Sequence, residues 1–224
     1  MIKSVCNYPI SQIFDIEAGV VYAVPKYQRE YTWSKNQWEN LFDDVLENDF
    51  GYFLGSIICI NQTTDALSVQ QLEVVDGQQR LTTLSLLFAA IYDALKSHAD
   101  RLDDDQRMEL FSLKRKLVLK NNEDKLRVIP QVIGARELPS YAGKRKIVRA
   151  YRYFQKRIEE LTKDQDNSVA SIMGFLEKVN KAALVKIEVS SHTDAYILFE
   201  SLNNRGMPLS AIDLIKNKLL AKLE

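Results

Sequence analysis

One stretch decides the fold: Val74-Val75-Asp76-Gly77-Gln78-Gln79-Arg80-Leu81-Thr82-Thr83-Leu84. Its β-branched start predicts a buried strand, and its Asp-Gly pair predicts a tight turn. Apolar residues then recur at helical spacing, namely Leu81, Leu84, Phe88, Ile91 and Leu95. This spacing predicts a long apolar helix over about 79–97, central to the domain, with polar side chains where the strand becomes the helix.

The polar residues at this junction suit an anion. A helix N-terminus presents free backbone N–H groups and the positive end of the helix dipole. Gly77 lets the backbone turn tightly, and Arg80 carries a permanent positive charge. Thr82 and Thr83 supply hydroxyls, while Asp76 is suited to bind a metal, orient a water or cap the helix. A capped turn without a ligand explains the same residues, and the lack of Gly-Lys-Ser/Thr excludes a P-loop.

Composition limits the class of protein. The 224 residues include 30 basic and 30 acidic side chains, which excludes a generally basic nucleic-acid-binding surface but not a local patch. Cys6 and Cys59 are widely spaced, so we expect reduced thiols in a cytoplasmic protein. We expect neither a signal peptide nor a membrane segment. Two isolated histidines, His98 and His192, are too few for a His-metal nuclease centre.

The residues before the central stretch predict a small sheet. The patterns indicate a short amphipathic helix within 10–16, strands at 20–24, 53–60 and 69–75, and an amphipathic helix at 35–48. The 53–60 run is nearly continuously apolar, as in a strand buried on both faces. We expect the 53–60 and 69–75 strands to pair as a hairpin.

A polar and aromatic loop, Pro25-Lys26-Tyr27-Gln28-Arg29-Glu30-Tyr31-Thr32-Trp33, precedes the first long helix. One interpretation is a packed connection whose aromatic side chains join the core. The other is a wall of a ligand pocket, with Arg29 binding an anion through its guanidinium.

The second half of the chain is mainly helical. Helices are expected at about 105–115, 140–162, 169–179 and 195–202, and from Ser210 onward, with a short hairpin around 121–124, an irregular segment at 130–140 and a strand at 184–189. The chain stops inside a helix, so we expect it to be the N-terminal part of a longer protein. The predicted fold class is α/β (α+β), a small mixed sheet with a central helix and a mainly helical C-terminal part.

The 140–162 helix has a strongly basic face: Lys144, Arg145, Lys146, Arg149, Arg152, Lys156 and Arg157. A solvated helix face explains this pattern. The alternative is DNA binding, with phosphates contacted by Lys144, Arg145, Arg149 and Arg152.

Three blocks together resemble the N-terminal domain of GmrSD-type restriction endonucleases. They are the Pro25–Trp33 loop, Asp76–Leu84, and Phe199-Glu200-Ser201-Leu202-Asn203-Asn204-Arg205-Gly206-Met207-Pro208-Leu209-Ser210 running into Asp213-Leu214-Ile215-Lys216. The resemblance implies a ParB/sulfiredoxin-like core, which we place at residues 1–100, with a helical elaboration at 101–224. It also implies a bacterial defence function in which nucleoside-triphosphate binding and hydrolysis with Mg²⁺ regulate a nuclease that acts on modified DNA.

The resemblance and the chemistry of the junction residues together assign site residues. Asp76, Gln79 and Arg80 become candidate catalytic residues, with Asp76 also the candidate Mg²⁺ ligand. The candidate phosphate-binding set is Gly77, Gln78, Arg80, Thr82, Gln28, Arg29, Asn203 and Arg205. The expected partners are a nucleoside triphosphate, DNA and a nuclease domain or subunit absent from this chain, and a homo-oligomer is compatible with the sequence. The alternatives are a non-enzymatic DNA-binding or regulatory domain and an interaction scaffold.

Overall fold

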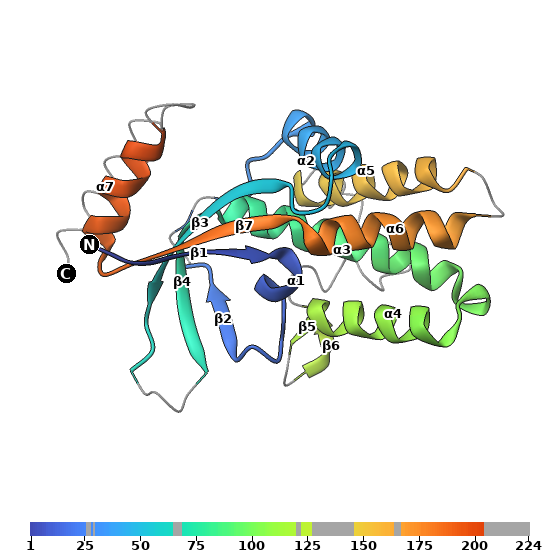
Figure 1. Cartoon of the computed structure of the whole chain (residues 1–224), viewed down its shortest axis with the longest axis horizontal. Coiled ribbons are helices and arrows are strands. Elements are labelled where there is room, and N and C mark those ends of the chain that lie inside the picture. The colour runs from blue at the N-terminus through green and yellow to red at the C-terminus, as the bar shows by residue number, and fades with distance from the viewer. Residues whose placement is uncertain are drawn as a thin grey trace.

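Figure 1 shows the computed structural model of the chain, which describes residues 1–25, 28, 30–64, 69–119, 122–126, 146–163 and 167–203. For 118, 119, 122–126, 202 and 203 it describes the backbone only. Several predictions therefore lie outside the described residues: those on Arg29, Lys144, Arg145 and Arg205, the irregular 130–140 segment, the first turn of the basic helix and the helix after Ser210.

The sheet has five strands in the order β1 (Ile2–Pro9), β7 (Ala183–Val189), β3 (Phe53–Asn61), β4 (Gln70–Asp76) and β2 (Val20–Ala23). β1 is antiparallel to β7, and β7 is parallel to β3. β3 is antiparallel to β4, as the predicted hairpin requires, and β4 is parallel to β2. The sheet is therefore mixed, and it takes strands from both sides of the boundary expected near residue 100.

The central strand β3 is buried on both faces, as predicted. Ile57 and Cys59 join the main core, whereas Ile58 and Ile60 join a smaller cluster on the opposite face. This alternation follows from the two-residue period of a strand. Helix α7 (His192–Asn203) covers the smaller cluster through Ala195 and packs on β3, β4 and β7.

The remaining helices form a layer beside the sheet (Figure 1). They are α1 (Ile10–Ile13), α2 (Lys35–Glu47), α3 (Gln78–Ser97), α4 (Asp104–Leu117), α5 (Lys146–Leu161) and α6 (Ser168–Lys181). A 3-10 turn spans Ala99–Arg101, and β5 (Val118–Leu119) pairs with β6 (Asn122–Leu126) in the predicted short hairpin. α3 packs on α4, α5 and α6, which confirms it as the central helix.

The structure confirms the mixed α+β class and shows one strand that the sequence did not predict. β1 is an edge strand whose side chains are mostly exposed. An exposed strand needs no apolar alternation, so hydrophobic periodicity carries no signal for it. None of the described helices combines the length and apolar character needed to cross a membrane.

Candidate functional site

The strand-to-helix junction is built around Gly77. β4 ends at Asp76, Gly77 adopts a left-handed conformation with φ of 92°, and α3 begins at Gln78. A Cβ at residue 77 would lie 2.6 Å from Ile57 Cγ2, so both the conformation and the available space require glycine. Gly77 is the N-cap residue, and no side-chain hydrogen bond caps the helix there. Helix α3 has 20 residues, and the side chain of its N-cap residue therefore satisfies none of its first-turn N–H groups.

Arg80 lies across the backbone of β3. Its Nη1 donates to the carbonyl oxygen of Ser56 at 2.7 Å. An added Cβ at Gly55, which has φ of 115°, would lie 2.7 Å from Arg80 Cζ. The register of β3 against β7 shifts between Phe53 and Ser56, so this irregularity and a glycine together make room for the guanidinium.

The charge of Arg80 is partly removed from water. Burial lowers the pKa of its guanidinium, and the nearby carboxylate of Asp76 acts in the opposite direction. Arginine stays protonated under such conditions, so the site holds a poorly hydrated positive charge. Its Nε and Nη2 make no hydrogen bond to another described residue. These donors and the first turn of α3 together form an arrangement suited to an anion.

Gln79 fastens the preceding loop to α3. Its side chain is buried, and its Oε1 accepts from the backbone N–H of Thr32 at 2.8 Å. Its Nε2 donates to the carbonyl oxygen of Glu30 at 3.2 Å. Both ends of the amide are therefore engaged with the backbone of the loop.

Gln28 makes the matching contact from the loop to the sheet. Its Nε2 donates to the carbonyl oxygens of Val74 and Val75, at 3.3 and 3.1 Å. Together with Gln79, it holds the loop against the last residues of β4 and the first turn of α3. The polar-aromatic loop and the Asp76–Leu84 stretch thus meet at one place.

A chain of hydrogen bonds from aromatic residues supports the same contact. Trp38 Nε1 donates to the Tyr31 hydroxyl at 2.8 Å, and that hydroxyl lies 2.7 Å from Thr83 Oγ1. Thr83 Oγ1 donates in turn to the carbonyl oxygen of Gln79 at 2.7 Å, so the Tyr31 hydroxyl is the donor to Thr83. Burial raises the pKa of Tyr31 to about 12. This part of the loop is a packed connection, in agreement with one of the two interpretations.

The other predicted residues at the junction differ in accessibility. Gln78 is buried, and Thr82 is half-buried with a hydroxyl that makes no hydrogen bond to a described residue.

Asn203, predicted from the third motif block, is the last residue of α7. α7 is held to the sheet at its start, where His192 Nε2 lies 3.0 Å from Glu73 Oε1 on β4.

The basic face of α5 divides into structural and exposed residues. Arg157 pairs with Asp43 on α2 at 2.6 Å and lies 4.4 Å from the centre of the Phe42 ring. Lys146 Nζ donates to the carbonyl oxygen of Thr32 at 2.9 Å, so it also supports the loop at the junction. Arg149 and Arg152 are exposed on the outer side of the helix.

Some residues of the junction were not predicted as site residues. Gly55 and Ser56 position Arg80, and Tyr31 and Thr32 position the loop, with Tyr31 bonded to the Thr83 hydroxyl that the sequence had offered to an anion. A signal for Gly55 exists in the sequence, because an isolated glycine inside a strand indicates a bulge or a close approach by another group. No such signal connects Tyr31 to Thr83, which are 52 positions apart.

The fold and the junction define a mixed α+β domain with an arginine and an acid beside the start of its central helix. The family model of the GmrSD restriction endonuclease N-terminal domain matches residues 10–220, and the chain belongs to this family. It is therefore part of a restriction endonuclease defence system. The match includes all three motif blocks. A search of curated proteins found no match to the chain.

Proposed function

We propose that the strand-to-helix junction binds a nucleoside triphosphate with Mg²⁺ and hydrolyses it, and that this activity regulates the nuclease of the restriction system. The observation that carries the proposal is the placement of Arg80. Its guanidinium is fixed by the carbonyl of Ser56, poorly hydrated, and left with donors that no described residue uses. Such a group is suited to a phosphate oxygen.

The rest of the junction fits a phosphate group as well. The N-cap residue Gly77 makes no side-chain cap hydrogen bond to the first turn of α3, and it keeps the backbone close to β3. Helix N-termini of this kind stabilise negative charge through their N–H groups and dipole. Thr82 supplies a half-buried hydroxyl on the same helix, four residues after Gln78. In the proposal, these groups and Arg80 hold the phosphates.

Asp76 is the residue proposed to hold Mg²⁺ or to orient the attacking water. It ends β4 directly before the junction and lies close enough to Arg80 to affect its pKa. No group of three His, Cys, Asp or Glu side chains that could hold a metal occurs in the described part of the chain. Mg²⁺ does not need one, because it commonly binds one or two carboxylates together with the phosphates of the substrate. Phosphoryl transfer depends mainly on positioning and charge neutralisation, which this set of groups supplies.

Gln28 and Gln79 have a specific place in the proposal. Their amide groups hold the loop against the junction. We propose that they act as positioning residues for the loop that contains Arg29 in the sequence, in addition to the phosphate-binding and catalytic roles predicted for them. Arg205 and Asn203 are proposed to reach the same ligand from the third motif.

The proposal is tested by calorimetric titration of the 224-residue chain with ATP, GTP, CTP and UTP, each with Mg²⁺, followed by phosphate-release assays. We expect at least one nucleotide to bind, with Arg80→Ala weakening affinity at least about tenfold by removing a charge-assisted contact. Asp76→Ala is expected to reduce turnover more than affinity. Lys96→Ala is the matched control, because Lys96 is exposed at the opposite end of α3. Failure of all four nucleotides to bind, or equal affinity in Arg80→Ala, would refute the proposal.

A second candidate function is DNA binding by the outer face of α5. The supporting observation is the exposure of Arg149 and Arg152, one turn apart on the same helix. Lys144 and Arg145 precede them in the sequence. DNA binding through phosphate contacts should weaken steeply as the salt concentration rises from about 50 to about 200 mM. A double charge reversal, Arg149→Glu with Arg152→Glu, should abolish DNA binding. If DNA binding survives the double reversal, the outer face of α5 is only a solvated helix surface.

A further inference from the structure

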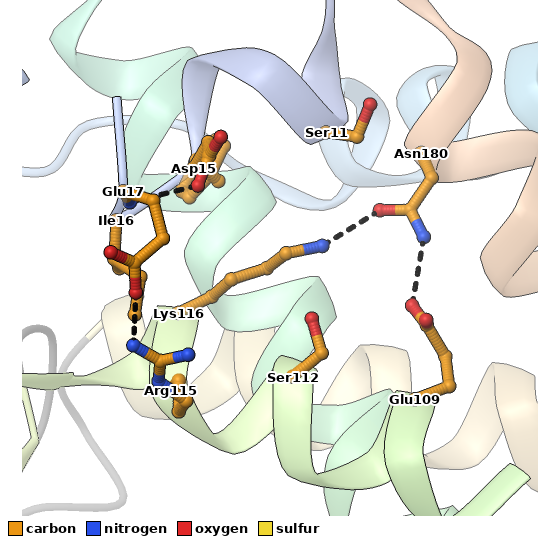
Figure 2. Close-up of a pocket in the computed structure, with 10 residues that line it drawn as sticks. Ser11, Asp15, Ile16, Glu17, Glu109, Ser112, Arg115, Lys116 and Asn180 are labelled. Atoms are coloured by element: carbon orange, nitrogen blue, oxygen red, sulfur yellow. Dashed lines mark hydrogen bonds and ion pairs between the residues drawn. The ribbon is translucent and has the colours of Figure 1, made fainter. Parts of the chain in front are cut away.

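A pocket of about 370 Å³ lies apart from the strand-to-helix junction (Figure 2). Its walls are α1 with the turn after it, α4 and α6, three segments far apart in the sequence. Lys116 from α4 lines this pocket. Its Nζ lies 5.4 Å from the centre of the Phe88 ring on α3. Phe88 is ten residues beyond Gln78 in the same helix, about 15 Å along its axis. The pocket is therefore a different place from the proposed nucleotide site.

The ammonium of Lys116 is only partly compensated in this pocket. The side chain crosses the pocket, and Nζ donates to Asn180 Oδ1 at 3.2 Å (Figure 2). This is its only hydrogen bond to a described residue, and it forms no ion pair with one. Burial lowers the pKa of Lys116, while Glu109 and Asp15 act in the opposite direction. A partly desolvated charge with two further N–H donors thus faces the pocket.

The carboxylates of the pocket, by contrast, already have donors. Glu109 Oε1 accepts from Asn180 Nδ2 at 3.3 Å. Asp15 Oδ1 accepts from the backbone N–H of Glu17 at 2.8 Å, and Glu17 pairs with Arg115. Lys116 uses one of its three donors and also lies over the Phe88 ring, so two N–H groups of a positive charge have no hydrogen-bond partner among the described residues. An incoming group that complements it must bring negative charge.

One hydroxyl is placed to assist. The Ser112 side chain points toward the Lys116 side chain, whereas the Ser11 hydroxyl points away from it (Figure 2). The Ser112 hydroxyl makes no hydrogen bond to another described residue. Hydroxyls donate and accept, so Ser112 can complete the coordination of a carboxylate held by the ammonium.

We propose that this pocket binds a small carboxylate that also bears a hydroxyl or amino group. Lys116 and Ser112 bind the carboxylate, and the second group of the ligand donates to Glu109 or Asp15. These two carboxylates disfavour a dianion such as phosphate, because like charges repel at close range. The volume is at the lower end for small-molecule sites, which limits the ligand to a small acid.

The test uses calorimetric or NMR titration of the 224-residue chain with four probes. L-lactate and L-serine share the carboxylate and differ in the second group, so they distinguish a hydroxy acid from an amino acid. Propane-1,2-diol retains hydroxyls without a charge, and inorganic phosphate supplies a multiply charged anion. We expect saturable binding of L-lactate or L-serine and no saturable binding of the diol. Tighter binding of phosphate, or no saturable binding of either carboxylate, would overturn the proposal.

Variants assign the binding to the pocket. Lys116→Ala is expected to raise the dissociation constant at least about tenfold, the usual effect of losing one charge-assisted hydrogen bond. Lys114→Ala is the matched control, because Lys114 is exposed on the same helix. Ser112→Ala removes one hydroxyl without removing the charge and is expected to raise the constant about threefold. It keeps the test valid if Lys116→Ala does not fold. Unchanged affinity in the folded pocket variants would overturn the proposal.

Discussion

The guanidinium of Arg80 occupies the space that a side chain at Gly55 would need. The two residues belong to α3 and β3, and an added Cβ at Gly55 would lie 2.7 Å from Arg80 Cζ. Arg80 is therefore positioned by the absence of a side chain on the neighbouring strand as much as by the carbonyl of Ser56.

Gly55→Ala is expected to displace Arg80 and to weaken nucleotide binding about tenfold, since it forces the guanidinium away from the carbonyl of Ser56. The φ of 115° adds a stability loss on the order of 1–3 kcal/mol. Calorimetric titration and thermal unfolding measure the two effects separately. Gly174→Ala is the control, because nothing lies within 4 Å of its added Cβ.

The clash itself is measured by a double-mutant cycle. In an Arg80→Ala background the Gly55→Ala substitution should cost less stability, because the colliding group is gone. Additive losses would show that the backbone conformation, and not Arg80, is the reason for glycine at residue 55.

Gln79→Met is expected to release the loop from α3. The substitution keeps the approximate volume but removes the acceptor for Thr32 and the donor for Glu30. We expect a stability loss of about 2 kcal/mol and faster amide exchange in the described part of the loop, residues 30–33. Gln71→Met, at an exposed position of β4, should show neither change. Unaltered exchange at Thr32 would contradict the role assigned to Gln79.

Tyr31 should make the free energy of unfolding depend on pH in the alkaline range. Its pKa is raised to about 12 in the folded protein, against about 10 for an unfolded tyrosine. The unfolded chain therefore loses this proton first, and the stability that it provides is complete below pH of about 10 and is lost as the pH rises toward 12. Tyr22 and Tyr151 have raised pKa values as well, so the comparison with Tyr31→Phe isolates one group.

Denaturant unfolding between pH 8 and 11 measures this effect. Wild type should lose stability more steeply than Tyr31→Phe above pH of about 10. Parallel curves for the two proteins would indicate that Tyr31 titrates normally in the folded state.

Arg157→Ala is expected to destabilise the fold by about 1–3 kcal/mol, since it removes the contact with Asp43 and the packing over Phe42. Lys156→Ala, one position away and exposed, should change stability by less than about 0.5 kcal/mol. If Arg157→Ala is as stable as the control, the contact between α2 and α5 does not depend on this residue.

Hydrophobic periodicity predicted the elements whose side chains are buried. The alternation of β3 and the apolar stripe of α3 are strong signals, because both elements lie at the centre of the core. The exposed strand β1 gave no such signal. The position of β7 between β1 and β3 could not be predicted either, because strand order depends on contacts distant in sequence.

The candidate site was predictable in part for the same reason. The motif residues Asp76, Gly77 and Arg80 were identified from local pattern and resemblance, and the structure brings Gln28 to the same junction. That the amides of Gln28 and Gln79 hold the loop required knowledge of the tertiary structure. The ParB/sulfiredoxin-like core, the nucleotide and the roles of the individual site residues stay predictions.

The place of β7 also governs how the domain folds. β1 pairs only with β7 among the described strands, and β7 begins more than 170 residues after β1 ends. During synthesis, β1 therefore has no partner until Ala183–Val189 have been made and have left the ribosome. Closing such a long loop before any pairing is gained makes folding slow and leaves the edge of β3 unprotected in the meantime. Shortened chains that end before Ala183 should consequently aggregate instead of forming a smaller stable core.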